Sequence, residues 1–359
     1  MRLDLLRPDQ AASAVARANT AYVPIGAVEY HGPHLPLGVD MITAVGICEQ
    51  ACDLDGGVVL PPSYLAIGTL DLPWTLCFSH GLVERWAEEV IDQLHHRGFE
   101  LVVLVTGHGP LDLVHLLKRV ARNRSTATGL AYAACYLEFN AALLAAPEVG
   151  EPGVIDHAST VETSWMLALR PDTVDVQALP GDPDAAVLGV YGRNPRFTAS
   201  AARGADQIEA SGRVLAQRAR QRREGTLDDL DDLRTFVRYC WPEPLVLTRD
   251  PGGALGVHNP GRSSRYLTGL RSVALDGVEL DLSESWLRND ATGETGTPVM
   301  VASLGSESGV YVRRDQTATL VIPALAQQLA SGAGGLLSVE VELGGVTTIA
   351  LETELDRGR

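Results

Sequence analysis

The sequence predicts a three-layer α/β/α domain with a mostly parallel sheet, followed by a smaller C-terminal all-β domain. In the first two thirds of the chain, short apolar segments alternate with helical segments, as in layered α/β domains. After the acidic stretch GTLDDLDD (residues 225–232), alternating or β-branched segments separated by Gly and Asp turns replace that pattern. We therefore place the first domain at residues 1–235 and the β-rich domain at residues 240–359.

The first predicted elements alternate between strand and helix. Residues 21–28 form a short apolar run, residues 41–54 carry a helical pattern, and residues 57–60 form a second apolar run before a Pro-Pro turn. The clearest helix is LVERWAEEVIDQLHHR at residues 82–97. Its apolar residues recur at helical spacing, and Gly98 is a natural C-terminal stop.

The remaining elements continue the same alternation before the pattern changes. The uniformly apolar run LVVLV at residues 101–105 is typical of a strand buried on both faces of a parallel sheet. A helix at residues 111–122, a strand at residues 130–136 and a helix at residues 160–169 complete the first domain. The β domain is predicted from the segments LVLT, RSVALDGVELDL, VYVRR, ATLVIP, LLSVEVEL and TTIALETEL.

Composition narrows the classes of partner. The chain has 359 residues, of which 45% are hydrophobic, enough for large cores. A formal net charge of −16 disfavours nucleic acid and anionic membranes as partners. No apolar run approaches the ~20 residues that span a bilayer, and the N-terminal stretch lacks the apolar core of a signal peptide. Five scattered cysteines imply no disulfide framework, so we expect a cytoplasmic protein.

The stretch VEYHGPHLPLGVD (residues 28–40) concentrates potential metal ligands. If Glu29 and His31 close a strand, their spacing puts both side chains on one face. Asp40 follows a Pro-containing loop that can fold back toward them. Carboxylates and imidazole together suit a divalent ion such as Zn, Mn or Fe, and Asp40 could bridge two ions. The alternative is that Asp40 only caps the helix beginning near Met41.

A second stretch, TGHGP, places His108 directly after the buried strand at residues 101–105. In layered α/β folds, ligand sites gather where the carboxyl ends of strands open into loops. We therefore expect His108 to point into the same site as Glu29 and His31. The alternative is a histidine that caps the following helix.

The third stretch is DHASTVETSW, residues 156–165. On one continuous helix, His157 and Glu162 would lie about 140° apart and could not share a face. His157 therefore belongs to the loop and Glu162 to the first helical turn. Ser159 and Glu162 also fit a capping box, in which Glu162 merely reaches back to a backbone N–H. Spacing does not choose between that role and metal binding. Elsewhere, Trp74 and Trp165 are interpreted as core residues or as an aromatic pocket wall.

Together these stretches resemble the creatininase (creatinine amidohydrolase) family. The family pattern Pro-x-Gly-x-x-Glu-x-His-Gly-Pro-His-x-Pro-x-x-x-Asp is matched at every fixed position by residues 24–40. A Gly-His-Gly stretch is matched at residues 107–109, and His-Ala-x-x-x-Glu-Thr-Ser at residues 157–164. The resemblance covers roughly residues 5–220, and the β-rich tail lies outside it.

The resemblance implies one or two divalent ions held by Glu29, His31, Asp40, His108 and an acidic partner. In creatininase that partner lies two residues after the Gly-His histidine, where this chain has Pro110. We therefore expect Glu162 to complete the second metal position. The departure argues against creatinine as the substrate.

The implied activity is metal-dependent hydrolysis of a C–N bond, in an amide, lactam or formamide, by a metal-activated water. The resemblance gives His157 or Glu162 the role of carrying the proton, and His34 that of orienting a ligand or contacting substrate. It also implies a small-molecule or small-peptide substrate and a homo-oligomer. A precursor-peptide peptidase, a non-catalytic metal-binding or assembly protein, and a metal-dependent lyase or isomerase remain as alternatives.

Overall fold

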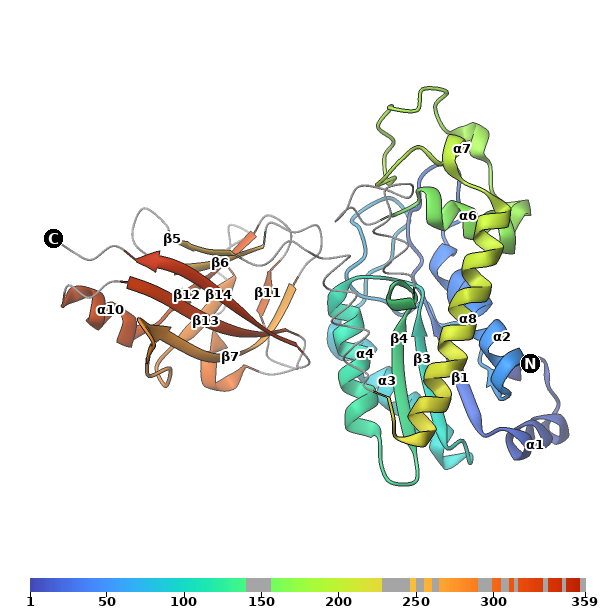
Figure 1. Cartoon of the computed structure of the whole chain (residues 1–359), viewed down its shortest axis with the longest axis horizontal. Coiled ribbons are helices and arrows are strands. Elements are labelled where there is room, and N and C mark those ends of the chain that lie inside the picture. The colour runs from blue at the N-terminus through green and yellow to red at the C-terminus, as the bar shows by residue number, and fades with distance from the viewer. Residues whose placement is uncertain are drawn as a thin grey trace. The chain divides into compact units, whose positions relative to one another are not determined.

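The computed structural model (Figure 1) describes two compact units of the chain. They comprise Met1–Gly109 with Val120–Pro242, and Pro110–Arg119 with Glu243–Arg359. The predicted boundary between residues 235 and 240 stays a prediction, because it lies outside the described residues. The described residues are 1–139, 156–227, 246–249, 255–259, 265–289, 299–304, 310–312, 316–331, 335–343 and 347–355.

A parallel sheet lies at the centre of the first unit. Its strands are β1 (Thr20–Ile25), β2 (Val58–Val59), β3 (Leu101–Thr106) and β4 (Leu130–Cys135), in the order β2-β1-β3-β4. Every residue of β1 and β3 is buried, which confirms the prediction of strands covered on both faces. β1 ends earlier than predicted, so Glu29 and His31 lie on the following loop and do not close the strand.

Helices cover both faces of this sheet. α2 (Val39–Asp55) connects β1 to β2, and α3 (His80–His96) returns from β2 to β3. Because the two crossovers run in opposite directions and such connections are right-handed, they lie on opposite faces. α8 (Ala201–Glu224) packs against α2, β3 and β4. Further helices among the described residues before residue 228 include α1 (Pro8–Arg17), α4 (Leu111–Arg124), α6 (Thr160–Leu169) and α7 (Pro195–Thr198).

This arrangement confirms the predicted layered α/β fold with a parallel sheet. The core contains large side chains with essentially no exposure, among them Trp165, Tyr22, Tyr132 and Ile47. None of the helices among the described residues combines the length and the apolar composition needed to cross a membrane.

The second unit contains two antiparallel sheets. One has the order β10-β9-β12-β6-β5, and the other has the order β11-β7-β13-β14 with β8 paired to β7. Their buried inner faces share a core that includes Val257, Val273 and Leu337. The strands are β5 (Val246–Arg249), β6 (Leu255–Asn259), β7 (Arg265–Leu275), β8 (Val278–Glu279), β9 (Trp286–Asn289), β10 (Val299–Met300), β11 (Val310–Val312), β12 (Gln316–Val321), β13 (Gly335–Leu343) and β14 (Thr347–Leu355).

The β-rich character of the C-terminal region is confirmed, with one helix that the prediction omitted. α10 (Pro323–Ala330) follows β12 directly. Its sequence, PALAQQLA, begins with Pro at the first helical position and continues with strong helix formers. That local signal was overlooked because the flanking segments alternate as strands do.

Candidate metal centre

The candidate site lies where two neighbouring strands end. Glu29 and His31 follow β1, and His108 follows β3, with Ile25 of β1 in register with Thr106 of β3. In the order β2-β1-β3-β4, the chain leaves β1 toward one edge of the sheet and leaves β3 toward the other. Such a switch point opens a crevice at the carboxyl ends of the strands, where ligands bind in α/β folds.

Two glycines let the N-terminus of α2 reach these strand ends. A Cβ on Gly26 would collide with the backbone of Asp40 and Met41, and a Cβ on Gly107 would collide with the Asp40 carbonyl. The close approach brings Asp40 between the two loops. The N-cap of α2 is Gly38, and Asp40 turns its side chain toward histidines. The alternative of Asp40 as a helix cap is therefore wrong.

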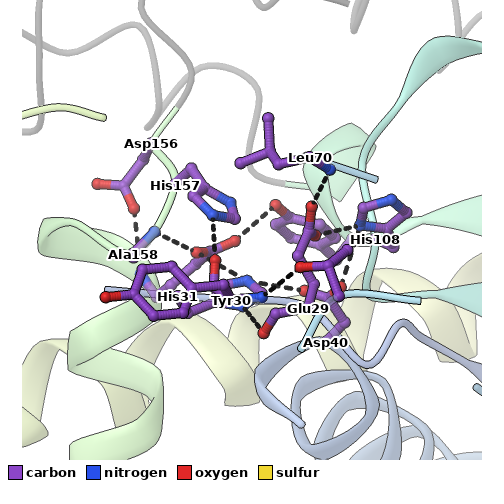
Figure 2. Close-up of polar contacts among 12 residues, drawn as sticks. Glu29, Tyr30, His31, Asp40, Leu70, His108, Asp156, His157 and Ala158 are labelled. Carbon is purple, nitrogen blue, oxygen red and sulfur yellow. Dashed lines mark hydrogen bonds and ion pairs between the residues drawn. The ribbon is translucent and has the colours of Figure 1, made fainter. Parts of the chain in front are cut away.

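The first ligand group consists of Glu29, Asp40 and His108 (Figure 2). His108 Nδ1 lies 3.1 Å from Glu29 Oε2 and 3.0 Å from Asp40 Oδ2. All three side chains are buried. The side chain of His108 thus faces two carboxylates and does not act as a cap for the following helix.

The second ligand group consists of His31, Asp40 and Glu162. His31 Nε2 lies 3.2 Å from Asp40 Oδ1 and 3.6 Å from Glu162 Oε2. Asp40 therefore turns one carboxylate oxygen to each histidine, as a bridging ligand would. Backbone N–H of Ala158 and the hydroxyl of Tyr136 donate to the two oxygens of Glu162, at 2.6 and 3.2 Å, and fix its orientation.

The capping-box alternative for Glu162 holds in one half only: Glu162 Oε2 accepts a hydrogen bond from a backbone N–H, that of Ala158, but Ser159 does not supply the reciprocal bond. Ser159 occupies the N-cap position of α6, but its side chain makes no capping hydrogen bond and donates to the Arg193 carbonyl instead. Asp156 takes the capping role by accepting hydrogen bonds from backbone N–H of Val161 at 3.0 Å and of Glu162 at 3.3 Å. The carboxylate of Glu162 is thereby left to face His31.

The chemistry of these groups fits a divalent cation. His31 Nδ1 lies 3.0 Å from the carbonyl oxygen of Glu29, which requires a proton on that nitrogen. In the neutral ring, Nε2 then presents a lone pair toward two carboxylate oxygens. Among the described residues, neither His31 Nε2 nor Asp40 Oδ2 has a well-aligned hydrogen bond. Buried electron-pair donors that converge without a proton between them need a cation.

Without an ion, protons fill the same role. Burial lowers the pKa of His31, but Asp40 and Glu162 outweigh it and raise the pKa to about 10. Burial likewise lowers the pKa of His108, and Glu29 and Asp40 raise it well above its usual value. Burial raises the pKa of Asp40, and the two imidazolium rings hold it below its usual value. Without a metal ion, His31 and His108 therefore keep their protons, and this positive charge balances the three surrounding carboxylates.

His157 lies on the loop before α6, where the spacing to Glu162 predicted it. Its Nε2 lies 3.0 Å from the carbonyl oxygen of Tyr30, and its ring centroid lies 4.3 Å from that of His31. His157 also forms a third potential ligand group with Glu29 and His31. Burial, followed by the charge of His31, lowers the pKa of His157, which favours a neutral ring.

His34 lies behind the ligands. Its Nε2 lies 2.9 Å from Thr163 Oγ1 on α6, and the side chain is buried. Burial and the nearby His31 lower the pKa of His34 to about 4, so the ring is neutral. These contacts connect the loop after β1 to the helix that carries Glu162, as expected of a positioning residue.

Three contributors to the site were missed in the sequence. Asp156 caps α6, Tyr136 orients Glu162, and the backbone N–H of Leu70 donates to Glu29 Oε1 at 2.6 Å. Tyr136 directly follows β4, so the strand-end argument that found His108 also applies to it. Asp156 lies four residues before the predicted helix and not at its N-cap position, Ser159, so the capping preference of Asp does not identify it. The Leu70 contact involves the backbone and leaves no signal in the sequence.

The fold and the site define a layered α/β protein with a candidate two-ion metal centre at the switch point of its sheet. The family model described as Creatininase: creatinine amidohydrolase matches residues 5–227. This chain belongs to the creatininase family.

Three curated relatives match part of the chain, and the names of all three describe hydrolytic enzymes. Creatinine amidohydrolase of Pseudomonas putida is 25% identical over 179 residues, which cover 45% of this chain and 69% of the relative. 3-Dehydro-scyllo-inosose hydrolase of Thermotoga maritima is 28% identical over 42% of this chain and 50% of the relative. Mycofactocin precursor peptide peptidase of Mycolicibacterium smegmatis is 29% identical over 42% of this chain and 58% of the relative.

Solved structures support the same fold. A crystal structure of creatinine amidohydrolase has a TM-score of 0.52 at 22% identity and covers 60% of this chain and 95% of that chain. A structure described as Creatininase Mn has a TM-score of 0.52 at 22% identity and covers 62% of this chain and 98% of that chain. At this identity the likeness concerns the fold alone.

Proposed function

We propose that this hydrolase is a metal-dependent amidohydrolase that cleaves an amide, lactam or formamide C–N bond. The observation that supports it most is the pair of buried ligand groups that share Asp40. Glu29 and His108 would hold one divalent ion with Asp40, and His31 and Glu162 would hold the other. A relative's structure is described as a manganese form, and we propose Zn, Mn or Fe for this chain.

A divalent ion bound by these residues would acidify a water molecule and polarise a carbonyl oxygen. The residues of the chain supply orientation and proton transfer. Glu162 is held by Ala158 and Tyr136, which suits a fixed ligand better than a mobile proton carrier. His157 suits proton transfer, because its lowered pKa keeps the ring neutral and the contact of Nε2 with Tyr30 leaves Nδ1 to accept a proton. His34 positions α6 through Thr163.

The charge of the surrounding segments bears on the substrate. Neither residues 26–84 nor residues 171–192 contain Lys or Arg. Segments that supply only negative formal charge favour a neutral or cationic substrate over one recognised through a carboxylate or phosphate. This favours a small amide, lactam or formamide. Cleavage of a precursor peptide remains the second candidate, since one relative is named as a peptidase of that kind.

Metal analysis combined with a hydrolysis panel tests the proposal. The purified chain is loaded with Zn, Mn or Fe and assayed on neutral lactams, formamides and a short peptide. We expect bound metal and C–N hydrolysis in the wild type, loss of both ions and of activity in Asp40→Ala, and loss of one ion and of activity in His31→Ala. Full metal content and activity in these variants would refute the assigned centre. Bound metal without hydrolysis of any panel member would favour the non-catalytic alternative. Homo-oligomeric assembly and a cytoplasmic location stay predictions.

A further inference from the structure

The loop Ala66–Phe78, here called the clamp loop, connects β2 to α3 and lies against the segment that carries Glu29. Backbone N–H of Phe78 donates to the carbonyl of Ala66 at 3.0 Å and closes the base of the loop. Within it, N–H of Leu72 donates to the carbonyl of Leu70 at 2.9 Å, and N–H of Thr75 donates to the carbonyl of Leu72 at 3.2 Å. The loop therefore has a defined conformation of its own.

Three hydrogen bonds join the clamp loop to consecutive residues of the ligand segment. N–H of Leu76 donates to the carbonyl of Val28 at 2.9 Å. N–H of Leu70 donates to Glu29 Oε1 at 2.6 Å, and N–H of Tyr30 donates to Thr75 Oγ1 at 3.0 Å. The bonds on either side of Glu29 fix its backbone, and the central bond fixes its carboxylate.

The central bond decides the orientation of the ligand. With Oε1 held by Leu70, Glu29 Oε2 is the oxygen that faces His108 Nδ1, at 3.1 Å. Groups that orient a metal ligand from behind tune the affinity of the ion. Glu162 has other supports, because it is held by Ala158 and Tyr136. His31 Nδ1 bonds to the Glu29 carbonyl, so the clamp loop reaches His31 only indirectly, through the peptide unit between Glu29 and Tyr30.

The tip of the clamp loop is strained and open to solvent. Trp74 has a φ of 67°, a left-handed conformation that bulky residues rarely adopt, and it is 79% exposed. Such a conformation persists only where surrounding contacts enforce it, and the bonds of Thr75 and Leu76 to the ligand segment follow immediately.

We propose that the clamp loop is a positioning element chiefly for one metal position, the Glu29–Asp40–His108 group. It acts directly through the Leu70 N–H on the carboxylate of Glu29 and is held in register by Thr75. It reaches the position formed by His31, Asp40 and Glu162 only indirectly, through the Glu29 carbonyl that supports His31. This inference rests on the proposed metal centre.

Cobalt titration of matched variants tests the proposal. Thr75→Val removes the acceptor of the Tyr30 N–H with little change in shape, and Thr75→Ser keeps it. Thr69→Val is the control, because Thr69 Oγ1 donates only within the loop, to the Leu76 carbonyl at 3.3 Å. We expect Thr75→Val to weaken one of two Co²⁺ positions by about 10- to 100-fold, with wild-type affinities in the two other variants.

A double-mutant comparison assigns the affected position. In a Glu162→Gln background, Thr75→Val should weaken the remaining position by the same factor. In a Glu29→Gln background, Thr75→Val should weaken the remaining position by a clearly smaller factor, because only the indirect support of His31 is then affected. Leu70→Pro removes the N–H that contacts Glu29, and its circular dichroism should match that of the wild type. Like Thr75→Val, it should weaken the Glu29–Asp40–His108 position.

Each outcome separates this inference from the proposed function. If the wild-type chain binds no Co²⁺, Zn²⁺ or Mn²⁺, the proposed metal centre itself fails. If it binds two ions, and Thr75→Val leaves both affinities unchanged or weakens both equally, the metal centre stands and the clamp-loop inference is overturned. Hydrogen exchange at the Leu70 amide provides a metal-independent check, and faster exchange in Thr75→Val than in Thr75→Ser is expected.

Discussion

Asp40 is the residue on which both ligand groups depend. Its two oxygens lie 3.2 Å from His31 Nε2 and 3.0 Å from His108 Nδ1. Of the two groups that share Asp40, Glu29 serves only one and Glu162 only the other. Loss of Asp40 would therefore affect both ions, whereas loss of either glutamate would affect one. Both histidine nitrogens that face Asp40 can bind either a proton or a metal ion, so protons and metal ions compete for them.

Metal binding is expected to release protons. The metal-free protein keeps His31 protonated up to its pKa of about 10, and His108 is shifted in the same direction. An ion can bind only to the unprotonated nitrogen, so affinity should rise with pH between neutrality and about pH 10. Calorimetry at pH 8 in buffers of different ionisation enthalpy should give about two protons for two ions. His31→Gln should lower that number by about one. Binding that is independent of pH would contradict the assignment.

Gly107 is predicted to be essential to the site although it has no side chain. In Gly107→Ala, the Cβ would meet the Asp40 carbonyl oxygen, and a backbone obstacle cannot rotate away. We expect α2 to shift at its N-terminus and both ions to be lost. Gly38→Ala is the matched control at the same helix end, because its Cβ would meet only the ends of side chains, Met41 Cε at 3.4 Å and Ile42 Cδ1 at 4.0 Å. Metal content measured by atomic emission compares the two. Full occupancy in Gly107→Ala would show that Asp40 is not positioned by this contact.

At the scale of elements, α8 positions the helices that carry the ligands. α8 lies along α6 and α2 (Figure 1), and it follows the part of the chain that supplies Glu162. Gly204 and Gly212 allow these crossings, because a Cβ on the first would meet the Ser164 backbone and on the second Gln50 of α2. Asp55 at the end of α2 is held by Arg220 and Arg223 of α8. The position of Glu162 thus depends on a helix that contributes no ligand.

Gly204→Ala is expected to destabilise the protein. The added methyl would force α6 and α8 apart, and overpacking of this kind costs about 1–3 kcal/mol. Gly81→Ala in α3 is the control, since nothing lies within 4 Å of its Cβ and Ala favours a helix by about 0.5–1 kcal/mol. Thermal melts of both variants give the comparison. An unchanged melting temperature in Gly204→Ala would mean that the crossing has room to adjust.

At the scale of the whole molecule, the chain has two separate cores. The first surrounds the parallel sheet, and the second lies among the antiparallel strands, where Val257, Leu337 and Val339 have no exposure. All five candidate metal ligands belong to the first unit. Ions that bind the folded first unit should therefore stabilise it selectively.

Scanning calorimetry with and without a chelator is expected to reveal this difference. Removal of the ions should lower the stability of the first unit by about 2.7 kcal/mol when metal was present at 100-fold its dissociation constant. The transition of the β-rich unit should stay where it was. A chelator-induced shift of both transitions, or a single transition, would contradict independent unfolding.

The amino-acid sequence predicts the layered fold, the β-rich tail and the five candidate ligands of the two groups that share Asp40, but not His157 as a potential ligand. It could do so because hydrophobic periodicity is local and because the ligand-rich stretches stand at strand ends. Ambiguity remained for Asp40 and Glu162, since each also stood where a helix cap is common.

The choice between metal ligand and helix cap for Asp40 and Glu162 follows from the packing of segments that are distant in the sequence. Asp40 meets both histidines because Gly26 and Gly107 let α2 approach two strand ends that are far apart in sequence. Glu162 faces His31 because Asp156 takes over the cap of α6. The clamp loop acts through a backbone N–H, which every residue except proline possesses, so no residue type reveals it. Local patterns specify elements and ligands, whereas pairings between distant segments depend on how those elements pack.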